Sequence, residues 1–227
     1  SIGTSSRFKN SKVLSIDLSL SSLAYAKRKT QELGLNDIDY MHADILKLKQ
    51  LNKKFDIIES AGVLHHMDDP MLGWKELVNR LKPGGLMKIG LYSELARQQV
   101  VKYRPKVVEP DTVAINRKIR AFRKQIISSK DVFSEQIRSS NDFFCMSELR
   151  DLIFHAQEHR FTIPQIKNCL SQLRLVFCGF ESDNINALFK ETNAEKDAGY
   201  DLDKWSAFEE DNPTLFSGMY QFWCQKI

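Results

Sequence analysis

The sequence predicts an α/β fold in which helices cover both faces of an open sheet. Short apolar runs end in small or acidic residues, amphipathic stretches separate these runs, and Ser, Asp, Pro and Gly mark the helix ends. In open sheets of this kind, ligands bind at the carboxyl ends of the strands. The residues that follow each apolar run are therefore the first candidates for a functional site.

Two strands near the start of the chain end in residues suited to binding a nucleotide. Val13–Ile16 leads into an Asp-Leu pair, and Ile38–His42 leads into an Ala-Asp-Ile run. A carboxylate can accept both hydroxyls of a ribose, and apolar side chains can pack on the faces of an adenine. Alternatively, each aspartate caps the helix or turn that follows it, which is a common use of Asp. The candidates at these strand ends are Asp17, Leu18, Ala43, Asp44 and Ile45.

The segment 55–70 is the most informative part of the sequence. Its strand, Phe55–Ile58, ends in small and polar residues that include Ser60 and Ala61. Two histidines follow, and the pair Asp69-Pro70 then has the pattern of a helix start. We expect these residues to lie where a ligand binds, because they follow directly after a strand.

Four motifs occur in a specific order: Asp-Leu at 17–18, Ala-Asp-Ile at 43–45, GVLHH at 62–66 and LKPGG at 81–85. In this order they resemble class I S-adenosylmethionine-dependent methyltransferases of the type 11/12/25-like group. Nicotinamide dehydrogenases also place an acidic residue at a strand end, but they do not usually show the last three motifs. The resemblance implies a Rossmann-like sheet and S-adenosylmethionine as the cofactor.

The resemblance also implies a role for each residue at the strand ends. Asp17 would accept the ribose hydroxyls, and Asp44 would accept the exocyclic amine of the adenine. Leu18 and Ile45 would contact the adenine faces. The backbone at 60–61 would face the methionyl part of the cofactor.

The glycine-rich loop of this family has no counterpart in the sequence. Class I methyltransferases carry a first strand and this loop before the segment that corresponds to 7–12, yet no G-x-G pattern occurs in the 227 residues. Residues 1–10 resemble the tail of the helix after the loop, so we expect a sequence cut inside a longer protein. The strands that end at Asp17 and Glu59 should then either pair directly or leave an open slot, and we favour the slot.

Three regions follow from the order of the predicted elements. Residues 1–100 are expected to form the S-adenosylmethionine-binding α/β core without its glycine-rich loop. Residues 101–173 have mostly helical patterns and are expected to be an insertion or substrate cap over the strand ends. In 174–227, Arg174–Phe180 and Gly218–Gln225 are predicted strands, and the resemblance implies that this antiparallel pair completes the sheet.

Three side chains near the later strand ends are candidates for catalysis. His65 and His66 follow the third predicted strand, and Tyr92 follows the strand Leu86–Leu91. The sulfonium methyl of the cofactor is already activated, so the protein mainly positions an acceptor and removes its proton where needed. A neutral imidazole can take that proton. Alternatively, one histidine packs against the helix after Pro70 and the other caps a turn or is solvated.

A fourth catalytic candidate, His155, lies in a helix predicted from Ser147 to Arg160. The run HAQEH at 155–159 fits the H-x-x-E-H pattern of inverted zinc peptidases. Such an enzyme needs a third ligand and a different scaffold, so we predict no metal site. The polar face of this helix is expected either to be solvated or to line an acceptor pocket with His155 or His159.

Composition limits the remaining classes of function. The net charge of +4 is too small to predict nucleic-acid binding by itself. The basic helix around Arg117–Lys124 is expected to be a solvated face, and the alternatives are contact with a nucleic acid or an anionic substrate and docking of a partner. The cysteines at 145, 169, 178 and 224 show no C-x-x-C spacing, which indicates free thiols in a reducing compartment. No apolar run approaches the ~20 residues that span a bilayer, so we expect a cytoplasmic protein without membrane contact.

The later half of the chain, through 149–170 and 218–227, is similar to bacterial methyltransferase domains that follow tetratricopeptide repeats. That resemblance implies repeats before residue 1 that could bind a protein partner. We expect methyl transfer from S-adenosylmethionine to an unidentified acceptor, a small molecule or a protein, with the fragment alone inactive. The alternative is a non-catalytic protein-interaction module on the same fold.

Overall fold

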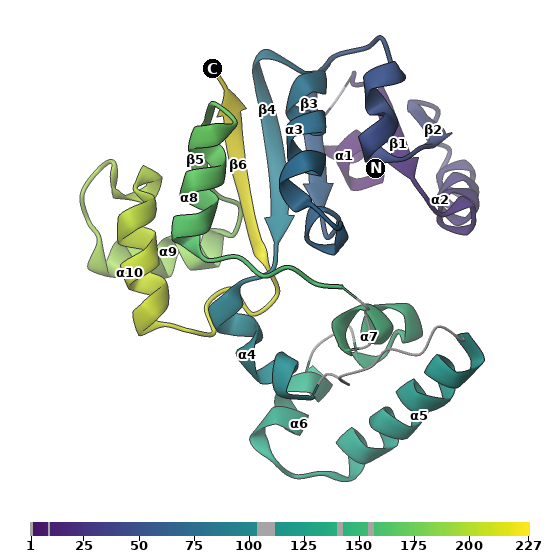
Figure 1. The fold of residues 1–227 in the computed structure, drawn as a ribbon, viewed down its shortest axis with the longest axis vertical. Helices are drawn as coiled ribbons and strands as arrows, with labels where there is room; N and C mark the ends of the chain where they lie inside the picture. The colour runs from purple at the N-terminus through teal and green to yellow at the C-terminus, as the bar shows by residue number, and fades with distance from the viewer. Residues whose placement is uncertain (1, 9, 104–111, 140–142, 154–156) are drawn as a thin grey trace.

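Six strands in the described part of the chain form a pair and a four-stranded sheet (Figure 1). The computed structural model describes residues 2–8, 10–103, 112–139, 143–153 and 157–227. The pair consists of the parallel strands β1 (Val13–Asp17) and β2 (Ile38–His42). The larger sheet has the order β3 (Phe55–Ala61), β4 (Leu81–Leu91), β6 (Tyr220–Lys226) and β5 (Leu175–Phe180).

Strand register brings the end of β3 close to the end of β4. These two strands are parallel, with Ser60 opposite Ile89 and Ala61 opposite Gly90. A Cβ added at Gly90 would lie 2.8 Å from the Cβ of Ala61, so this close approach requires glycine. β6 runs antiparallel to both β4 and β5, and the last two strands therefore complete the sheet as an antiparallel pair.

Among the described residues, no strand pairs β1 with β3, directly or through a strand between them. The helix α1 (Ile2–Arg7) instead makes side-chain bonds to both parts of the fold. The hydroxyl of Thr4 donates to Glu59 on β3 at 2.7 Å, and the hydroxyl of Ser5 donates to Asp37, just before β2, at 2.6 Å. Direct pairing of the two strands, the less favoured of the two expectations, is thus not seen.

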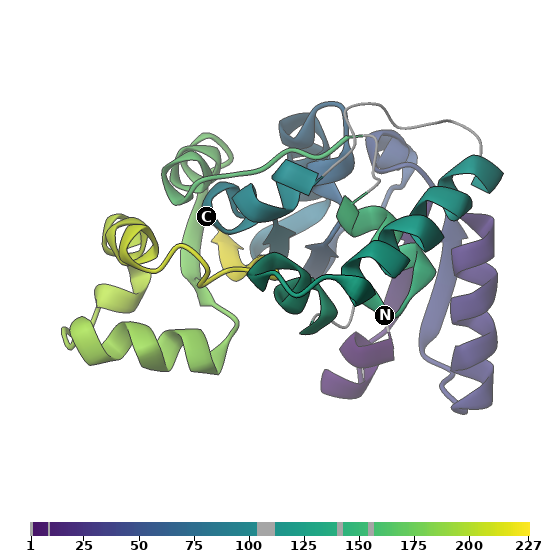
Figure 2. The ribbon, with the colours of Figure 1, turned by 90° about the horizontal axis from the view of Figure 1, so that it is seen from below.

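Helices begin at the capping residues that the sequence indicates. Asp69 starts α3 (Pro70–Arg80) by accepting the Leu72 N–H at 3.0 Å, and Thr162 starts α8 (Ile163–Gln172) with a complete capping box. Figure 2 shows α3 and α8 on one side of the large sheet and α1 on the other. Together with the sheet order, this arrangement confirms the predicted Rossmann-like α/β fold with helices on both faces.

The other helices connect or extend this frame. In chain order they are α2 (Leu20–Glu32), η1 (Ile45–Gln50), η2 (Leu64–His66), α4 (Glu94–Tyr103), α5 (Thr112–Ser128), α6 (Val132–Ser139), α7 (Met146–Ile153), α9 (Asp183–Thr192), η4 (Ala198–Tyr200) and α10 (Leu202–Asp211). Figure 1 shows α4 to α7 beyond the carboxyl ends of β3 and β4. None of the described helices is long and apolar enough to cross a membrane.

Two apolar cores support the structure. The larger core lies against the big sheet and contains the fully buried side chains of Trp74, Met87 and Ile89. Ile16 and Met41 of the small sheet pack against the same core, so both sheets share it. A second core joins α5, α6 and α7 through side chains that include Ile119, Leu149 and Ile153.

The predicted helix from Ser147 to Arg160 is wrong in its second half. α7 ends at Ile153, and residues 157–160 are not helical. Phe161 instead forms a parallel bridge with Ser93 after β4, where its N–H donates to the Tyr92 carbonyl at 2.9 Å. Pairing with the end of β4 satisfies backbone groups that a continued helix would have used internally.

Candidate cofactor and acceptor site

The two aspartates at the first strand ends use one carboxylate oxygen each to fix the local turn. Asp17 Oδ1 accepts the Ser19 N–H at 2.8 Å, and Asp44 Oδ1 accepts the Leu46 N–H at 2.9 Å. The capping role considered for both residues is therefore real. Asp17 is exposed and Asp44 is partly buried, and no described residue donates a hydrogen bond to either Oδ2. Capping and ligand binding are compatible here, because each carboxylate has a second oxygen that can accept a hydrogen bond.

The apolar candidates beside the aspartates differ in exposure. Leu18 is 68% exposed, while Ile45 is partly buried and packs, with Ala43, against the large core. The His42 ring bonds to the Leu18 carbonyl at 2.9 Å, which ties the two strand ends together. Leu18 thus presents a free apolar surface, whereas Ile45 divides its surface between the core and solvent.

At the end of β3, Ser60 and Ala61 leave the sheet next to a glycine turn. Ser60 is 6% exposed, and within the described residues its hydroxyl is buried without a hydrogen-bond partner. Ala61 is exposed, and Gly62 has a φ of +75°, a backbone conformation that favours glycine. An unsatisfied hydroxyl at a strand end is what a polar ligand group would satisfy.

The structure brings together three of the four catalytic candidates. The rings of His65 and Tyr92 have centroids 4.0 Å apart, and those of His65 and His66 are 4.3 Å apart. His65 is fully buried, while His66 and Tyr92 are partly exposed. His155 lies outside the described residues. His65 is therefore buried against the rings of His66 and Tyr92, which are themselves partly exposed.

A short extended segment, Gln157–Phe161, runs across this cluster, and we call it the strap. The Gln157 carbonyl lies 3.0 Å from Nδ1 of His66, and the His159 N–H donates to the His65 carbonyl at 2.7 Å. At its far end, Phe161 bridges to the residue after Tyr92. The strap thus contacts the backbone or side chain of every candidate in the cluster.

Sequence analysis missed a buried ion pair beneath the cluster. The guanidinium of Arg97 lies 3.8 Å from the centroid of the Tyr92 ring and 2.5 Å from Glu158 Oε2. The side chains of Arg97 and Glu158 are 2% and 0% exposed. The expectation of a solvated Glu158 on a helix face is therefore wrong, because this carboxylate is buried against an arginine 61 residues away in sequence.

Glu209 is a second buried carboxylate that the sequence did not single out. It accepts hydrogen bonds at 2.7 Å from the hydroxyls of Ser93 and Tyr220. Burial raises the pKa of Glu209, and the hydrogen bonds from Ser93 and Tyr220 oppose that rise. Since the Ser93 hydroxyl also accepts the Ala96 N–H at 3.1 Å, Glu209 anchors the start of α4 directly after Tyr92.

Within the described residues, no three His, Cys, Asp or Glu side chains could hold a metal ion together. Glu158 of the H-x-x-E-H run is engaged by Arg97 instead.

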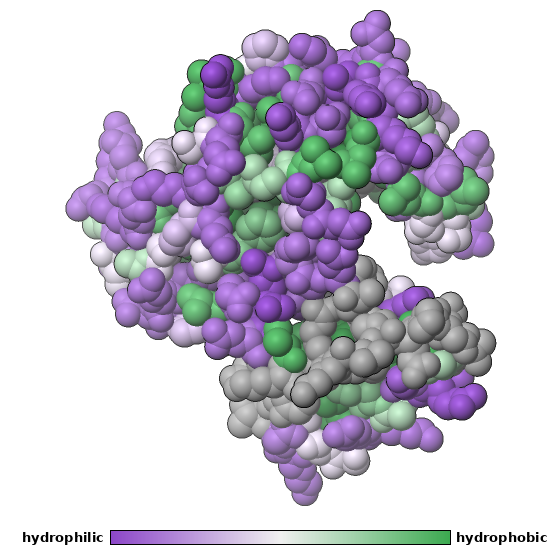
Figure 3. Space-filling view, viewed as in Figure 1, coloured by the Kyte–Doolittle hydropathy of each residue, from purple (hydrophilic) through white to green (hydrophobic). Residues whose placement is uncertain are grey.

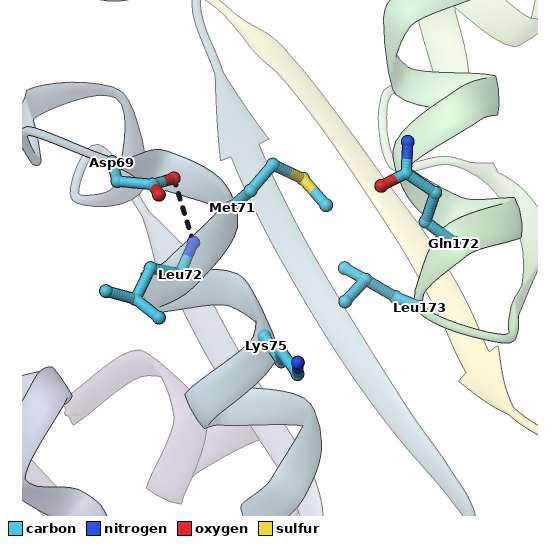
Figure 4. A pocket seen from close by; sticks show the side chains of 6 residues that line it. All are labelled: Asp69, Met71, Leu72, Lys75, Gln172 and Leu173. Atoms are coloured by element: carbon cyan, nitrogen blue, oxygen red, sulfur yellow. Dashed lines mark hydrogen bonds between the residues drawn. The ribbon is translucent and has the colours of Figure 1, made fainter.

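A groove of about 300 Å³ lies between α3 and the end of α8 (Figure 4). Its lining residues are Asp69, Met71, Leu72, Lys75, Gln172 and Leu173. None of the candidate cofactor or catalytic residues lines this groove, so it is separate from the site. Figure 3 instead shows a notch in the surface between the part of the molecule that carries α2 and the part that carries α5.

Comparison with known proteins agrees with this arrangement. The family model described as "Methyltransferase domain" matches residues 3–89. An uncharacterised protein of Synechococcus sp. is 25% identical over 210 residues, which are 88% of this chain and 50% of that protein. The demethylmenaquinone methyltransferase of Oceanobacillus iheyensis is 25% identical over 75% of this chain and 68% of that enzyme.

Solved structures share the fold at low sequence identity. PKMT2 from Rickettsia typhi superposes with a TM-score of 0.60 at 13% identity, over 98% of this chain and 45% of that protein. The chain spans about half the length of this protein and of the Synechococcus relative. The ordered motifs and the methyltransferase-domain match over residues 3–89 support the resemblance to class I S-adenosylmethionine-dependent methyltransferases, and the solved structures share the fold.

Proposed function

We propose that this chain binds S-adenosylmethionine at the ends of β1, β2 and β3 and takes part in methyl transfer to an acceptor with a removable proton. The observation that carries the proposal is the combination, at these strand ends, of two carboxylates, the exposed apolar side chain of Leu18 and a buried hydroxyl without a partner among the described residues. Ligand sites of open α/β sheets occupy this position. The family match over residues 3–89 and the solved complex of PKMT2 with AdoHcy support the same cofactor.

The residues at the strand ends fit the parts of this cofactor. Asp17 retains Oδ2 for the ribose hydroxyls, and Asp44 retains Oδ2 for the amine of the adenine. Leu18 supplies an apolar surface for one adenine face, with Ile45 as a partly buried second contact. The Ser60 hydroxyl would gain the partner that it lacks among the described residues.

In the acceptor site, His66 is the residue that we assign as general base. A backbone carbonyl only accepts hydrogen bonds, so Nδ1 of His66 must donate to the Gln157 carbonyl. The neutral ring then carries its lone pair on Nε2, the nitrogen that can remove a proton. In the reaction, the acceptor atom bonds to the methyl carbon, the carbon–sulfur bond breaks toward sulfur, and Nε2 takes the acceptor proton.

The acceptor is either a small molecule or a protein side chain. A base at Nε2 suits a hydroxyl, an amine or an acidic carbon, because each of these loses a proton on methylation. One named relative is a demethylmenaquinone methyltransferase, which favours a small-molecule acceptor. We also propose that tetratricopeptide repeats outside this chain bind a protein partner. Such a partner could itself be the acceptor, which would favour a protein side chain.

Binding and transfer assays with the full-length protein test this function. Radiolabelled S-adenosylmethionine should bind, and its label should pass to a component of a cell extract. Tight cofactor binding without transfer to any component would favour the non-catalytic interaction module. Absence of cofactor binding would contradict the proposal at its first step.

A further inference from the structure

The strap, Gln157–Phe161, is fixed to the candidate site by its backbone at three points. Its first carbonyl binds the His66 ring, and its central N–H binds the His65 carbonyl. At its last residue, the Phe161 N–H donates to the Tyr92 carbonyl at 2.9 Å, and the Phe161 carbonyl accepts the Glu94 N–H at 2.8 Å. These contacts use backbone groups of the strap and fix its register against the site.

A buried charge pair locks the middle of the strap in place. Glu158 points inward to Arg97, whose guanidinium nitrogens lie 2.5 and 3.4 Å from its two carboxylate oxygens. Arg97 also donates to the Leu152 carbonyl at 3.4 Å and stacks on Tyr92. One arginine therefore connects the second core, the strap and the catalytic candidates.

This lock should set the geometry at His66, because Gln157 is the immediate neighbour of Glu158. A carbonyl that moved by more than about 0.5 Å would lengthen a 3.0 Å hydrogen bond beyond the useful range. The ring would then lose the contact that selects its tautomer. Free neutral histidine prefers the proton on Nε2, which is the wrong form for a base at Nε2.

We propose that Arg97 and Glu158 are positioning residues that hold the strap so that the Gln157 carbonyl keeps His66 in its Nδ1–H form. The catalytic use of that form rests on the proposed function, but the tautomer itself does not. Among the described residues, the rings of His65 and Tyr92 lie near His66, with centroids at 4.3 and 6.0 Å. The strap supplies a polar partner for Nδ1, the Gln157 carbonyl at 3.0 Å.

Nitrogen NMR of the full-length protein with ¹⁵N-labelled histidine measures the tautomer directly. The His66 signals are assigned by their loss in His66→Gln. In the unaltered protein, we expect a protonated Nδ1 and an unprotonated Nε2 at a pH where the ring is neutral. A predominantly Nε2–H ring would overturn the proposal, and this result needs no variant that could fail to fold.

Two variants test the lock itself. Glu158→Gln removes the buried charge and should shift the His66 signals toward the Nε2–H form. The matched control is Glu94→Gln, which removes the carboxylate that binds Arg160 of the strap at 2.8 Å but is 40% exposed. The control should keep the original tautomer. An unchanged His66 spectrum in folded Glu158→Gln, or an equal shift in both variants, contradicts the lock.

Methyl-transfer kinetics add a second readout where an acceptor is found. Glu158→Gln should lower kcat by about tenfold or more, a part of the range for general-base catalysis, and leave the cofactor Kd unchanged. Failure of the proposed function would appear as absent cofactor binding or transfer in the unaltered protein. Failure of the strap proposal would appear in the nitrogen spectra, so the two failures are distinguishable.

Discussion

Asp17 holds a turn of the fold with one carboxylate oxygen, and the proposed function gives its other oxygen to a ligand. Its Oδ1 holds the turn before α2, and its other oxygen is exposed at the strand end. Asp17→Ala should weaken S-adenosylmethionine binding by about 1.5–3 kcal/mol, or roughly 10- to 150-fold in Kd, because it removes a charged hydrogen-bond acceptor. Asp17→Asn should lose less. Isothermal calorimetry on the full-length protein measures both values.

Asp201 supplies the matched control for this substitution. Its Oδ1 accepts the Asp203 N–H at 2.9 Å, the same local geometry as Asp17 with Ser19, but at the start of α10. Asp201→Ala should therefore remove an equivalent side-chain contact to the backbone of a turn and leave the cofactor affinity unchanged. Equal Kd values for Asp17→Ala and the unaltered protein would end the ribose assignment.

Glu209 predicts a pH dependence of stability with a defined sign. Because burial raises its pKa above the ordinary value of 4.5, the folded state holds this proton more tightly than the unfolded state. The contribution of Glu209 to the free energy of unfolding should thus be greatest below about pH 4.5 and should fall as pH rises through the folded-state pKa. In Glu209→Gln that contribution should be independent of pH.

Urea unfolding at several pH values between 4.5 and 8 measures this effect. The stability of the unaltered protein relative to Glu209→Gln should decrease with rising pH. Glu191→Gln, which changes an exposed glutamate on α9, is the control and should show no such trend. A constant difference between Glu209→Gln and the unaltered protein would mean that Glu209 titrates normally in the fold.

Among the elements, α8 begins with a capping box whose two side chains can be removed by single substitutions. The Thr162 hydroxyl accepts the Gln165 N–H at 3.3 Å, and the Gln165 side chain accepts the Thr162 N–H at 2.8 Å. Thr162→Ala should lower the free energy of unfolding by about 0.5–2 kcal/mol, the range for an N-cap. A double-mutant cycle with Gln165→Ala should show coupling, since the two side chains form one reciprocal cap. Strict additivity would contradict the cap.

The elements also show which features a sequence reveals. The start of α8 and the strand Ile38–His42 were predictable because their signals lie within a few residues of the element. The strap was not predictable, because its conformation depends on Arg97, a distant partner. The helical spacing that begins at Leu149 predicted a helix through Arg160, but Phe161 pairs with the end of β4 and residues 157–160 are not helical. Likewise, nothing near Glu209 in sequence indicates that Ser93 binds it.

At the scale of the candidate site, the sequence identified the residues at the strand ends but not their supports. Asp17, Asp44, His65, His66 and Tyr92 could all be placed next to predicted strands. Their roles stay predictions. The buried Arg97–Glu158 pair could not be found from charge pattern alone, because an H-x-x-E-H run equally describes a solvated helix face.

In the whole molecule, the two sheets should differ in local stability. Among the described strands, β4 has hydrogen-bonded neighbours on both sides, whereas β1 pairs only with β2. In the 227-residue chain, amide protons of β1 and β2 should exchange more than about tenfold faster than those of β4 and β6, or about 1.4 kcal/mol less protected. Native-state hydrogen exchange measures this difference. Equal protection across all six strands would show that α1 and the shared core couple the sheets fully.

The position of β6 has a consequence for how the protein is made. Tyr220–Lys226 lies between β4 and β5, yet it leaves the ribosome after both of them. During synthesis, β4 and β5 therefore emerge with inner edges that have no partner, while the capped helices α3 and α8 can form at once. Such unpaired edges invite contact with other nascent chains. We expect nascent chains in which β6 has not yet emerged to depend on chaperones until Lys226 is free of the ribosome.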